Sequence, residues 1–261
     1  MSMDKVVASA AEAVADIKDG ATIAVGGFGL AGIPWFLIDA LLEQGASDLE
    51  IVSNNLGVDG QGLGKLLEAH RIRRAVSSYI GENKEFMRQY LAGELEVELT
   101  PQGTLAERLR AGGAGIGAFF TPSGVGTVVA NGGMPWKYNA DGSVAISSPP
   151  KEVREFNGRR MVLETGIEAD VALVRAAVAD RHGNLRFHAA AQNFNPPAAM
   201  SGRLTIVEAE KVVEPGELDP ADVHVAGVFV DRVVALTPEQ AQFRMIEKRT
   251  TTPRPGTDEE A

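Results

Sequence analysis

The sequence predicts an α/β fold: an open, mainly parallel sheet flanked by helices. In the first half of the chain, short apolar segments such as Thr22–Val25 alternate with amphipathic ones such as Pro34–Leu42. That alternation is typical of βαβ units. Hydrophobic residues make up 44% of the 261, enough for a large core. We expect one domain over residues 1–248 and a disordered tail over 249–261, which is rich in proline and acids.

The boundaries of the first elements follow from capping signals. Asp19-Gly20 ends the first predicted helix, Pro34 begins the second, and Gly45 ends it. The predicted helices are Val6–Lys18, Pro34–Leu42, Gly62–His70, Glu85–Ala92 and Thr104–Arg110. The predicted strands between them are Thr22–Val25, Leu49–Ser53, Ala75–Ile80, Leu95–Leu99 and Ala118–Phe120.

The middle of the chain has a different composition. Residues Ala130–Pro150 contain Gly132-Gly133, Met134-Pro135, Asp141-Gly142 and Pro149-Pro150, which are turn signals. They predict a β-rich insertion of loops and short antiparallel strands. Beyond it, Asp180–Asn184 is expected to be a turn among the strands Met161–Leu163, Val171–Val178, Leu185–Phe187 and Leu204–Val207.

Charge and composition exclude several classes of function. The net charge of −10 argues against nucleic-acid binding, which requires a basic surplus. The basic cluster His70–Arg74 is interpreted as a solvated helix end, with a local anion contact as the alternative. The four histidines are scattered and cysteine is absent, so no metal site is expected. Without a long apolar run or a signal-like N-terminus, we expect a cytoplasmic protein that does not bind membranes.

The strongest local signal is the glycine-rich run Gly26–Gly32, between a predicted strand and a predicted helix. Glycines allow close approach of a ligand, and a helix N-terminus favours an anion. The run matches G-x-G-x-x-G, but a dinucleotide site also needs an acid at the end of the second strand. That strand ends instead in Ser53-Asn54-Asn55. A structural turn and a different anionic ligand therefore remain open.

Other candidate residues follow neighbouring strands. Asn54 and Asn55 stand at a strand end, where α/β sheets bind ligands, although they also suit an Asx turn. Gln102 can donate to a developing oxyanion. The Glu82 carboxylate can serve as a nucleophile, or simply stabilise a helix dipole. Glu94, Glu96 and Glu98 are expected on the solvent face of a strand. Without a G-x-S-x-G elbow, the sequence shows no complete set of nucleophile and base.

Several longer motifs occur in a characteristic order. They are Gly26–Pro34, Val52–Asn55, Ser77–Phe86, Gly93–Arg108, Arg110–Gly115, Glu152–Phe156 and Asn193–Pro196. Together they resemble the A-type chain of 3-oxoacid (succinyl-CoA:3-ketoacid) CoA-transferases, over roughly residues 4–233. Two departures stand out: Trp35-Phe36 follows Pro34 where this family commonly has Glu-Asn, and Ala31 replaces a common cysteine. The aromatic pair is expected to affect the interface between subunits or the mouth of the site.

The resemblance implies a function that this chain does not complete alone. In that family a B subunit carries a catalytic glutamate, and CoA passes by a ping-pong mechanism through a glutamyl-CoA thioester, typically from succinyl-CoA to acetoacetate. It implies an α2β2 heterotetramer, with coenzyme A as substrate and no permanently bound cofactor. Gln102 matches the oxyanion donor, and Asn54, Asn55 and Glu82 are implied to lie near the substrate. The CoA-contacting turn matches Gly26, Gly27, Phe28, Gly29, Leu30, Ala31 and Gly32.

Three alternatives stay open at this point. The acceptor could be 3-oxoadipate or another 3-oxoacid instead of acetoacetate. The chain could be a non-catalytic or regulatory paralogue that keeps the fold. It could also be an isomerase-like binder of sugar phosphates with a similar α/β topology.

Overall fold

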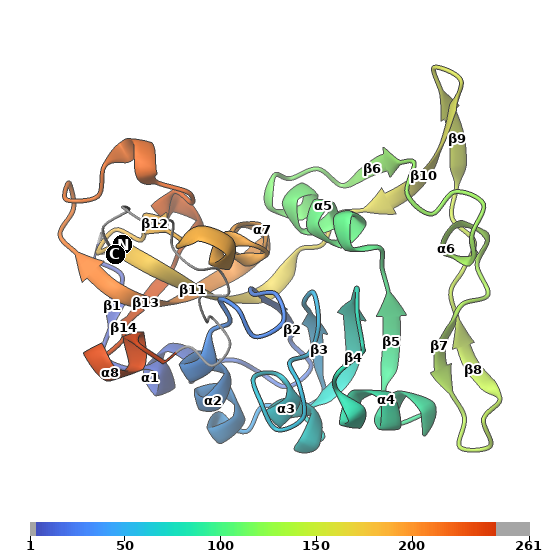
Figure 1. Ribbon diagram of the computed structural model, residues 1–261, viewed down its shortest axis with the longest axis horizontal. Coiled ribbons are helices and arrows are strands. Elements are labelled where there is room, and N and C mark those ends of the chain that lie inside the picture. The colour runs from blue at the N-terminus through green and yellow to red at the C-terminus, as the bar shows by residue number, and fades with distance from the viewer. Residues whose placement is uncertain (1–3, 244–261) are drawn as a thin grey trace, which may run out of the picture.

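One nine-stranded sheet organises residues 4–243, the part of the chain that the computed structural model describes (Figure 1). Its central strand β2 (Thr22–Val25) pairs in parallel with β3 (Leu49–Val52) and with β11 (Ala169–Asp180). The strand order is β1-β14-β13-β11-β2-β3-β4-β5, and β12 pairs with β11. The remaining strands are β1 (Val6–Val7), β4 (Ile72–Ser77), β5 (Glu96–Leu99), β12 (Leu185–Arg186), β13 (Gly202–Val213) and β14 (Arg232–Ala235).

The direction of strand succession reverses between β2 and β11. From β2 the chain proceeds outward through β3, β4 and β5, and from β11 it proceeds through β13 and β14 on the other side. Among the described strands of this sheet, every ladder is parallel except the one between β11 and β12. The predicted open, mainly parallel sheet is confirmed. Such a reversal is where open α/β sheets bind ligands, at the carboxyl ends of the strands.

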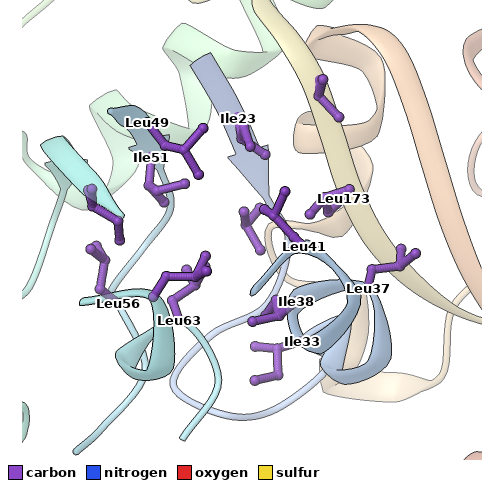
Figure 2. Close-up of a cluster of buried hydrophobic side chains, with 14 of the residues drawn as sticks. Ile23, Ile33, Leu37, Ile38, Leu41, Leu49, Ile51, Leu56, Leu63 and Leu173 are labelled. Carbon is purple, nitrogen blue, oxygen red and sulfur yellow. The ribbon is translucent and has the colours of Figure 1, made fainter. Parts of the chain in front are cut away.

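Helices cover both faces of the sheet, and alternate residues of each strand point to opposite sides. Ile23 and Ile51 pack against Leu37, Ile38 and Leu41 of α2 on one face (Figure 2). Ala24 and Val52 join the core beneath α5 and α7 on the other face. The helices are α1 (Ala10–Val14), α2 (Trp35–Gln44), α3 (Gly64–Glu68), α4 (Lys84–Leu91), α5 (Gln102–Gly113), α6 (Val128–Asn131), α7 (Asn195–Ser201) and α8 (Pro238–Ala241).

The predicted β-rich insertion is present and projects beyond β5 (Figure 1). It consists of a three-stranded antiparallel sheet and a separate antiparallel hairpin. The Tyr90 hydroxyl donates to the Pro135 carbonyl (2.6 Å) and ties the hairpin to α4. The strands are β6 (Ala118–Thr121), β10 (Arg159–Thr165) and β9 (Val153–Phe156) in the sheet, and β7 (Pro135–Tyr138) and β8 (Val144–Ser147) in the hairpin.

The first predicted helix is wrong at both ends. Val6-Val7 forms strand β1, which pairs with Val233-Val234 of β14, and helix α1 covers only Ala10–Val14. Ser9 caps that helix by accepting a hydrogen bond from the Glu12 amide (3.1 Å). A strand partner so distant in the sequence leaves no local signal, so amphipathic periodicity alone extends the helix too far. The tail expected over 249–261 lies outside the described residues.

The prediction that Glu94, Glu96 and Glu98 form a solvent face is wrong for Glu98. Its side chain is buried between Arg74, which also pairs with Glu50 and Glu96, and Arg108 (2.6 Å). Burial opposes ionisation of Glu98, but the two arginines outweigh it and hold its pKa below the usual range. The β7–β8 hairpin contributes to this burial, because its Trp136 stacks on the guanidinium of Arg74, which pairs with Glu98.

A buried carboxylate holds the start of α2. Glu208 on β13 is fully buried, and its Oε2 accepts hydrogen bonds from the amides of Phe36 (2.9 Å) and Leu37 (3.0 Å). Its Oε1 accepts a hydrogen bond from Arg175 on β11 (3.1 Å). Burial raises the pKa of Glu208 to about 7, against the opposing effect of Arg175 and the two amides. One side chain thus ties α2 to two central strands.

Replacing Glu208 by alanine is expected to lower the free energy of unfolding by about 3 kcal/mol, because it leaves Arg175 and two helix amides without this partner. Urea unfolding of this variant and of a control provides the measurement. The matched control is Glu107→Ala, which removes a surface pair with Arg110 and should cost at most about 0.5 kcal/mol. Equal unfolding midpoints for the two variants would contradict this account of α2.

Candidate functional site

A cavity of about 580 Å³ lies at the carboxyl ends of β2, β3, β4 and β5. Residues that follow four consecutive strands line it, next to the reversal of strand order between β2 and β11. This is the position at which open α/β sheets bind ligands. The lining residues are Phe28, Gly29, Leu30, Ala31, Asn54, Asn55, Gly57, Val58, Ser78, Tyr79, Gly81, Glu82 and Gln102.

The centre of the predicted glycine turn lines this cavity. Phe28 and Ala31 exchange two backbone hydrogen bonds (3.0 and 2.9 Å) and close a tight loop around Gly29 and Leu30. Gly29 has φ +62°, which favours glycine, and a Cβ there would meet no atom within 4 Å. The Leu30 side chain is buried and anchors the loop. The backbone of this loop is therefore presented to the cavity in one fixed shape.

The outer glycines of the same turn do not line the cavity. A Cβ on Gly26 would lie 2.0 Å from Asn195 Oδ1, and one on Gly32 would lie 2.9 Å from the Ala191 carbonyl. A Cβ on Gly27 would collide with the side chain of the nearby Ile33, 2.3 Å away. These three positions are glycine because the chain packs closely against itself there. The seven residues expected to contact CoA thus separate into a cavity-lining centre and a packed rim.

A second glycine turn, missed from the sequence, follows β3. The Gln61 amide donates to the Val58 carbonyl (3.0 Å), and Gly57 and Gly60 have φ of +62° and +68°. Gly57 and Val58 line the cavity beside the first turn. The closely spaced glycines over residues 57–64 are the sequence signal for this turn. The predicted helix Gly62–His70 overlapped its end, whereas α3 begins only at Gly64.

Four of the predicted site residues, Gly29, Asn54, Asn55 and Gln102, are joined by hydrogen bonds. Asn54 Oδ1 accepts from Gln102 Nε2 (2.9 Å) and from the Ser78 hydroxyl (2.7 Å). Asn54 Nδ2 donates to Asn55 Oδ1 (3.2 Å), which also accepts from the Gly29 amide (2.8 Å). The chain of amides therefore spans the ends of β2, β3, β4 and β5. It places Gln102, a potential oxyanion donor, against the cavity.

Glu82 lines the same cavity with φ +64°, just before Asn83, which caps α4. Of the described residues that line the cavity, Glu82 alone carries a formal charge. Ser78, Tyr79 and Gly81 are further lining residues, which belong to the Ser77–Phe86 motif but were not predicted as site residues. Their position directly after β4, next to Glu82 in the sequence, could have identified them as site residues. Neutral amides thus dominate the polar surface of the site.

The start of α2 does not serve the cavity as an anion site. The amides of Phe36 and Leu37 donate to the Glu208 carboxyl group, so a side chain of the protein itself occupies this helix N-terminus. Of the two places expected for Trp35 and Phe36, the mouth of the site is wrong, and the interface between subunits stays a prediction. Trp35 is buried, and both rings pack against Phe243 at 5.3 and 6.0 Å between centroids, away from the cavity.

Two further findings concern residues 4–243 as a whole. In this described part of the chain, no group of three or more acidic or histidine side chains is arranged to hold a metal ion. Nor does it contain a helix with the length and apolar character needed to cross a bilayer.

Comparison with known proteins identifies the family. The model of the family described as Coenzyme A transferase matches residues 7–236. The chain belongs to the coenzyme A transferase family. It is 68% identical over 232 residues to the A chain of a probable succinyl-CoA:3-ketoacid coenzyme A transferase from Mycobacterium tuberculosis, covering 89% of this chain and 94% of that protein. The corresponding chain of the Xanthomonas campestris enzyme is 55% identical over 235 residues, 90% of this chain and 88% of that one.

Longer proteins contain a matching half. This CoA-transferase chain is 55% identical over 230 residues to a human mitochondrial succinyl-CoA:3-ketoacid coenzyme A transferase, covering 88% of this chain but 44% of the human one. The crystal structure of an acyl-CoA transferase (YdiF) from Escherichia coli superposes with a TM-score of 0.75 at 25% identity, covering 92% of this chain and 48% of that one. Glutaconate coenzyme A-transferase from Acidaminococcus fermentans shares the fold (TM-score 0.73, 22% identity, 91% and 77% coverage). The chain is thus a CoA-transferase subunit of the A type.

Replacing Gly26 by alanine is expected to lower the free energy of unfolding by about 1–3 kcal/mol, because the new methyl group overlaps Asn195 Oδ1. Urea titration measures this effect. The control is Gly117→Ala, at an exposed site where a Cβ meets no atom within 4 Å, and it should leave stability within about 1 kcal/mol. An unaffected Gly26→Ala protein would mean that this glycine is not required for packing.

Proposed function

We propose that this chain is the A-type component of a heteromeric enzyme that transfers coenzyme A from succinyl-CoA to acetoacetate. The names of the relatives above support succinyl-CoA as the donor and a 3-ketoacid, the class to which acetoacetate belongs, as the acceptor. The observation that carries the proposal is the Gln102 amide, which lies against the cavity with Nε2 held by Asn54. An amide donor at that place suits the oxyanion that forms when a thioester carbonyl is attacked.

In the proposed reaction the nucleophile comes from a B subunit. Its glutamate carboxylate attacks the thioester carbonyl and the CoA thiolate leaves, which yields a mixed anhydride. The thiolate then attacks the glutamyl carbonyl, releasing the first acid and leaving a glutamyl-CoA thioester. The second acid accepts CoA through the reverse steps. Gln102 donates a hydrogen bond to the oxyanion, and the Phe28–Ala31 loop forms one wall for CoA, next to Asn54, Asn55 and Glu82.

The geometry of Glu82 bears on which chain supplies the nucleophile. Glu82 lies on the wall of the cavity, and an ionised carboxylate needs no base to attack a thioester, so Glu82 is the alternative nucleophile within this chain. The resemblance to A-type chains instead assigns the nucleophile to a glutamate of the B subunit. We also propose that the assembly is an α2β2 heterotetramer in the cytoplasm; light scattering of the co-expressed complex would test its stoichiometry.

The decisive experiment locates the covalent intermediate. The chain is co-expressed with its candidate B subunit, the complex is incubated with succinyl-CoA, and the thioester is trapped by borohydride reduction. Mass spectrometry is expected to find the modification on a glutamate of the B subunit, and assays are expected to show transfer to acetoacetate. Modification of Glu82 would overturn the assignment of the nucleophile. Transfer to 3-oxoadipate but not to acetoacetate would overturn the acceptor.

Replacing Gln102 by alanine in the intact complex is expected to lower kcat about 100-fold, with a smaller change in KM, because an oxyanion donor acts mainly in the transition state. Steady-state assays with both substrates measure the effect. Gln242→Ala, at a glutamine that does not line the cavity, is the matched control and should keep kcat within about twofold. A Gln102→Ala enzyme with unchanged kcat would remove this residue from the mechanism.

A further inference from the structure

We propose that Ser78 is a positioning residue that fixes the orientation of the Gln102 amide through Asn54. The inference rests on the proposed role of Gln102 as the oxyanion donor. It assigns a task to a cavity-lining serine that shares Asn54 Oδ1 with Gln102, at 2.7 Å from the serine hydroxyl and 2.9 Å from Gln102 Nε2. Ser78 acts on Gln102 only through this shared acceptor.

The direction of the hydrogen bonds follows from a backbone amide. The Gly29 N–H can only donate, so the Asn55 atom 2.8 Å from it is the carbonyl oxygen Oδ1. The Asn54 atom facing that oxygen at 3.2 Å must then be the donor Nδ2. The other end of the Asn54 amide is the acceptor Oδ1, and the Gln102 atom that contacts it must be Nε2. The glycine turn therefore dictates which face of Gln102 is a donor.

The Ser78 hydroxyl completes this arrangement. The Asn54 main-chain carbonyl already accepts hydrogen bonds from the Ser78 amide (3.0 Å) and the Ser77 hydroxyl (2.9 Å). The Ser78 hydroxyl is 3.1 Å from that carbonyl but 2.7 Å from Asn54 Oδ1. The hydroxyl has one proton to donate, and it donates to Asn54 Oδ1, which is nearer and has fewer other donors than the main-chain carbonyl. Asn54 Oδ1 then has two donors, one from the end of β4 and one from α5.

Three hydrogen bonds hold the Asn54 amide in this orientation: Ser78 and Gln102 donate to Oδ1, and Nδ2 donates to Asn55 Oδ1. In the flipped state Nδ2 would face the Gln102 Nε2 donor, and Oδ1 would face Asn55 Oδ1. Asn54 is 3% exposed, so water cannot readily satisfy the mismatched groups. The orientation of Gln102 is thus set before substrate arrives, which is the condition for effective stabilisation of a developing oxyanion. Without the Ser78 hydroxyl, one of these three hydrogen bonds on Asn54 is lost, and Oδ1 keeps Gln102 as its one remaining donor among them.

The test is a double-mutant cycle in the co-expressed complex, with Ser78→Ala, Gln102→Ala and both together. Ser78→Ala is expected to lower kcat about fivefold to tenfold, the effect of one lost hydrogen bond, while KM for each substrate stays within about twofold. In the Gln102→Ala background the same change should lower kcat less than about twofold, because the group it positions is already absent. Ser78→Cys, of similar shape, provides the comparison if the alanine variant fails to assemble.

Ser201→Ala is the control for losing a buried serine. Ser201 is 3% exposed and its hydroxyl donates to the Ala198 carbonyl (2.9 Å), away from the cavity, so kcat should stay within about twofold. An unchanged kcat in Ser78→Ala, or an equal loss in both backgrounds, would overturn the positioning role. Failure of the proposed function has a different signature: the wild-type complex would not transfer CoA, or Gln102→Ala alone would keep full activity.

Discussion

The structure around the cavity depends on one buried carboxylate. Glu208 binds the first free amides of α2 and the Arg175 guanidinium, and so fixes α2 relative to β11 and β13. The main-chain amide of Arg175 in turn donates to Asn195 Oδ1 (3.1 Å), the atom that leaves no room for a side chain at Gly26. The glycine turn is therefore held from the interior by the protein's own charges and amides, and its opposite side is free to line the cavity.

This arrangement explains how far the sequence could predict the fold. The alternation of strands and helices through β5 is local, because each strand is short and carries its own apolar residues, and most of the turns carry their own glycine or proline. The tight packing of Gly26 depends on Asn195, which is distant in the sequence. The residues around Asn195 do not indicate that it packs against Gly26. Strand β1 likewise exists only through its pairing with β14. What could not be predicted is in each case a contact between distant segments.

The site shows the same division. Asn54 and Gln102 were recognisable because each follows a strand, and parallel neighbouring strands bring their carboxyl ends together. Their direct contact depends on the side-chain rotamers of both residues, which cannot be predicted from the pattern of residue types. Ser78 was overlooked for the same reason: a serine after a strand is common, and only its 2.7 Å contact with Asn54 Oδ1 distinguishes it. Glu98 was misassigned because the inserted hairpin that helps to cover it is remote in sequence.

The lack of a cation among the described residues that line the cavity has a consequence for the proposed catalysis. A cation in the site would attract the carboxylates of the substrate acids before and during reaction, and would stabilise ground state and transition state alike. Neutral amide donors, fixed in orientation by Gly29, Asn55, Asn54 and Ser78, interact weakly with a thioester carbonyl and strongly with the oxyanion it becomes.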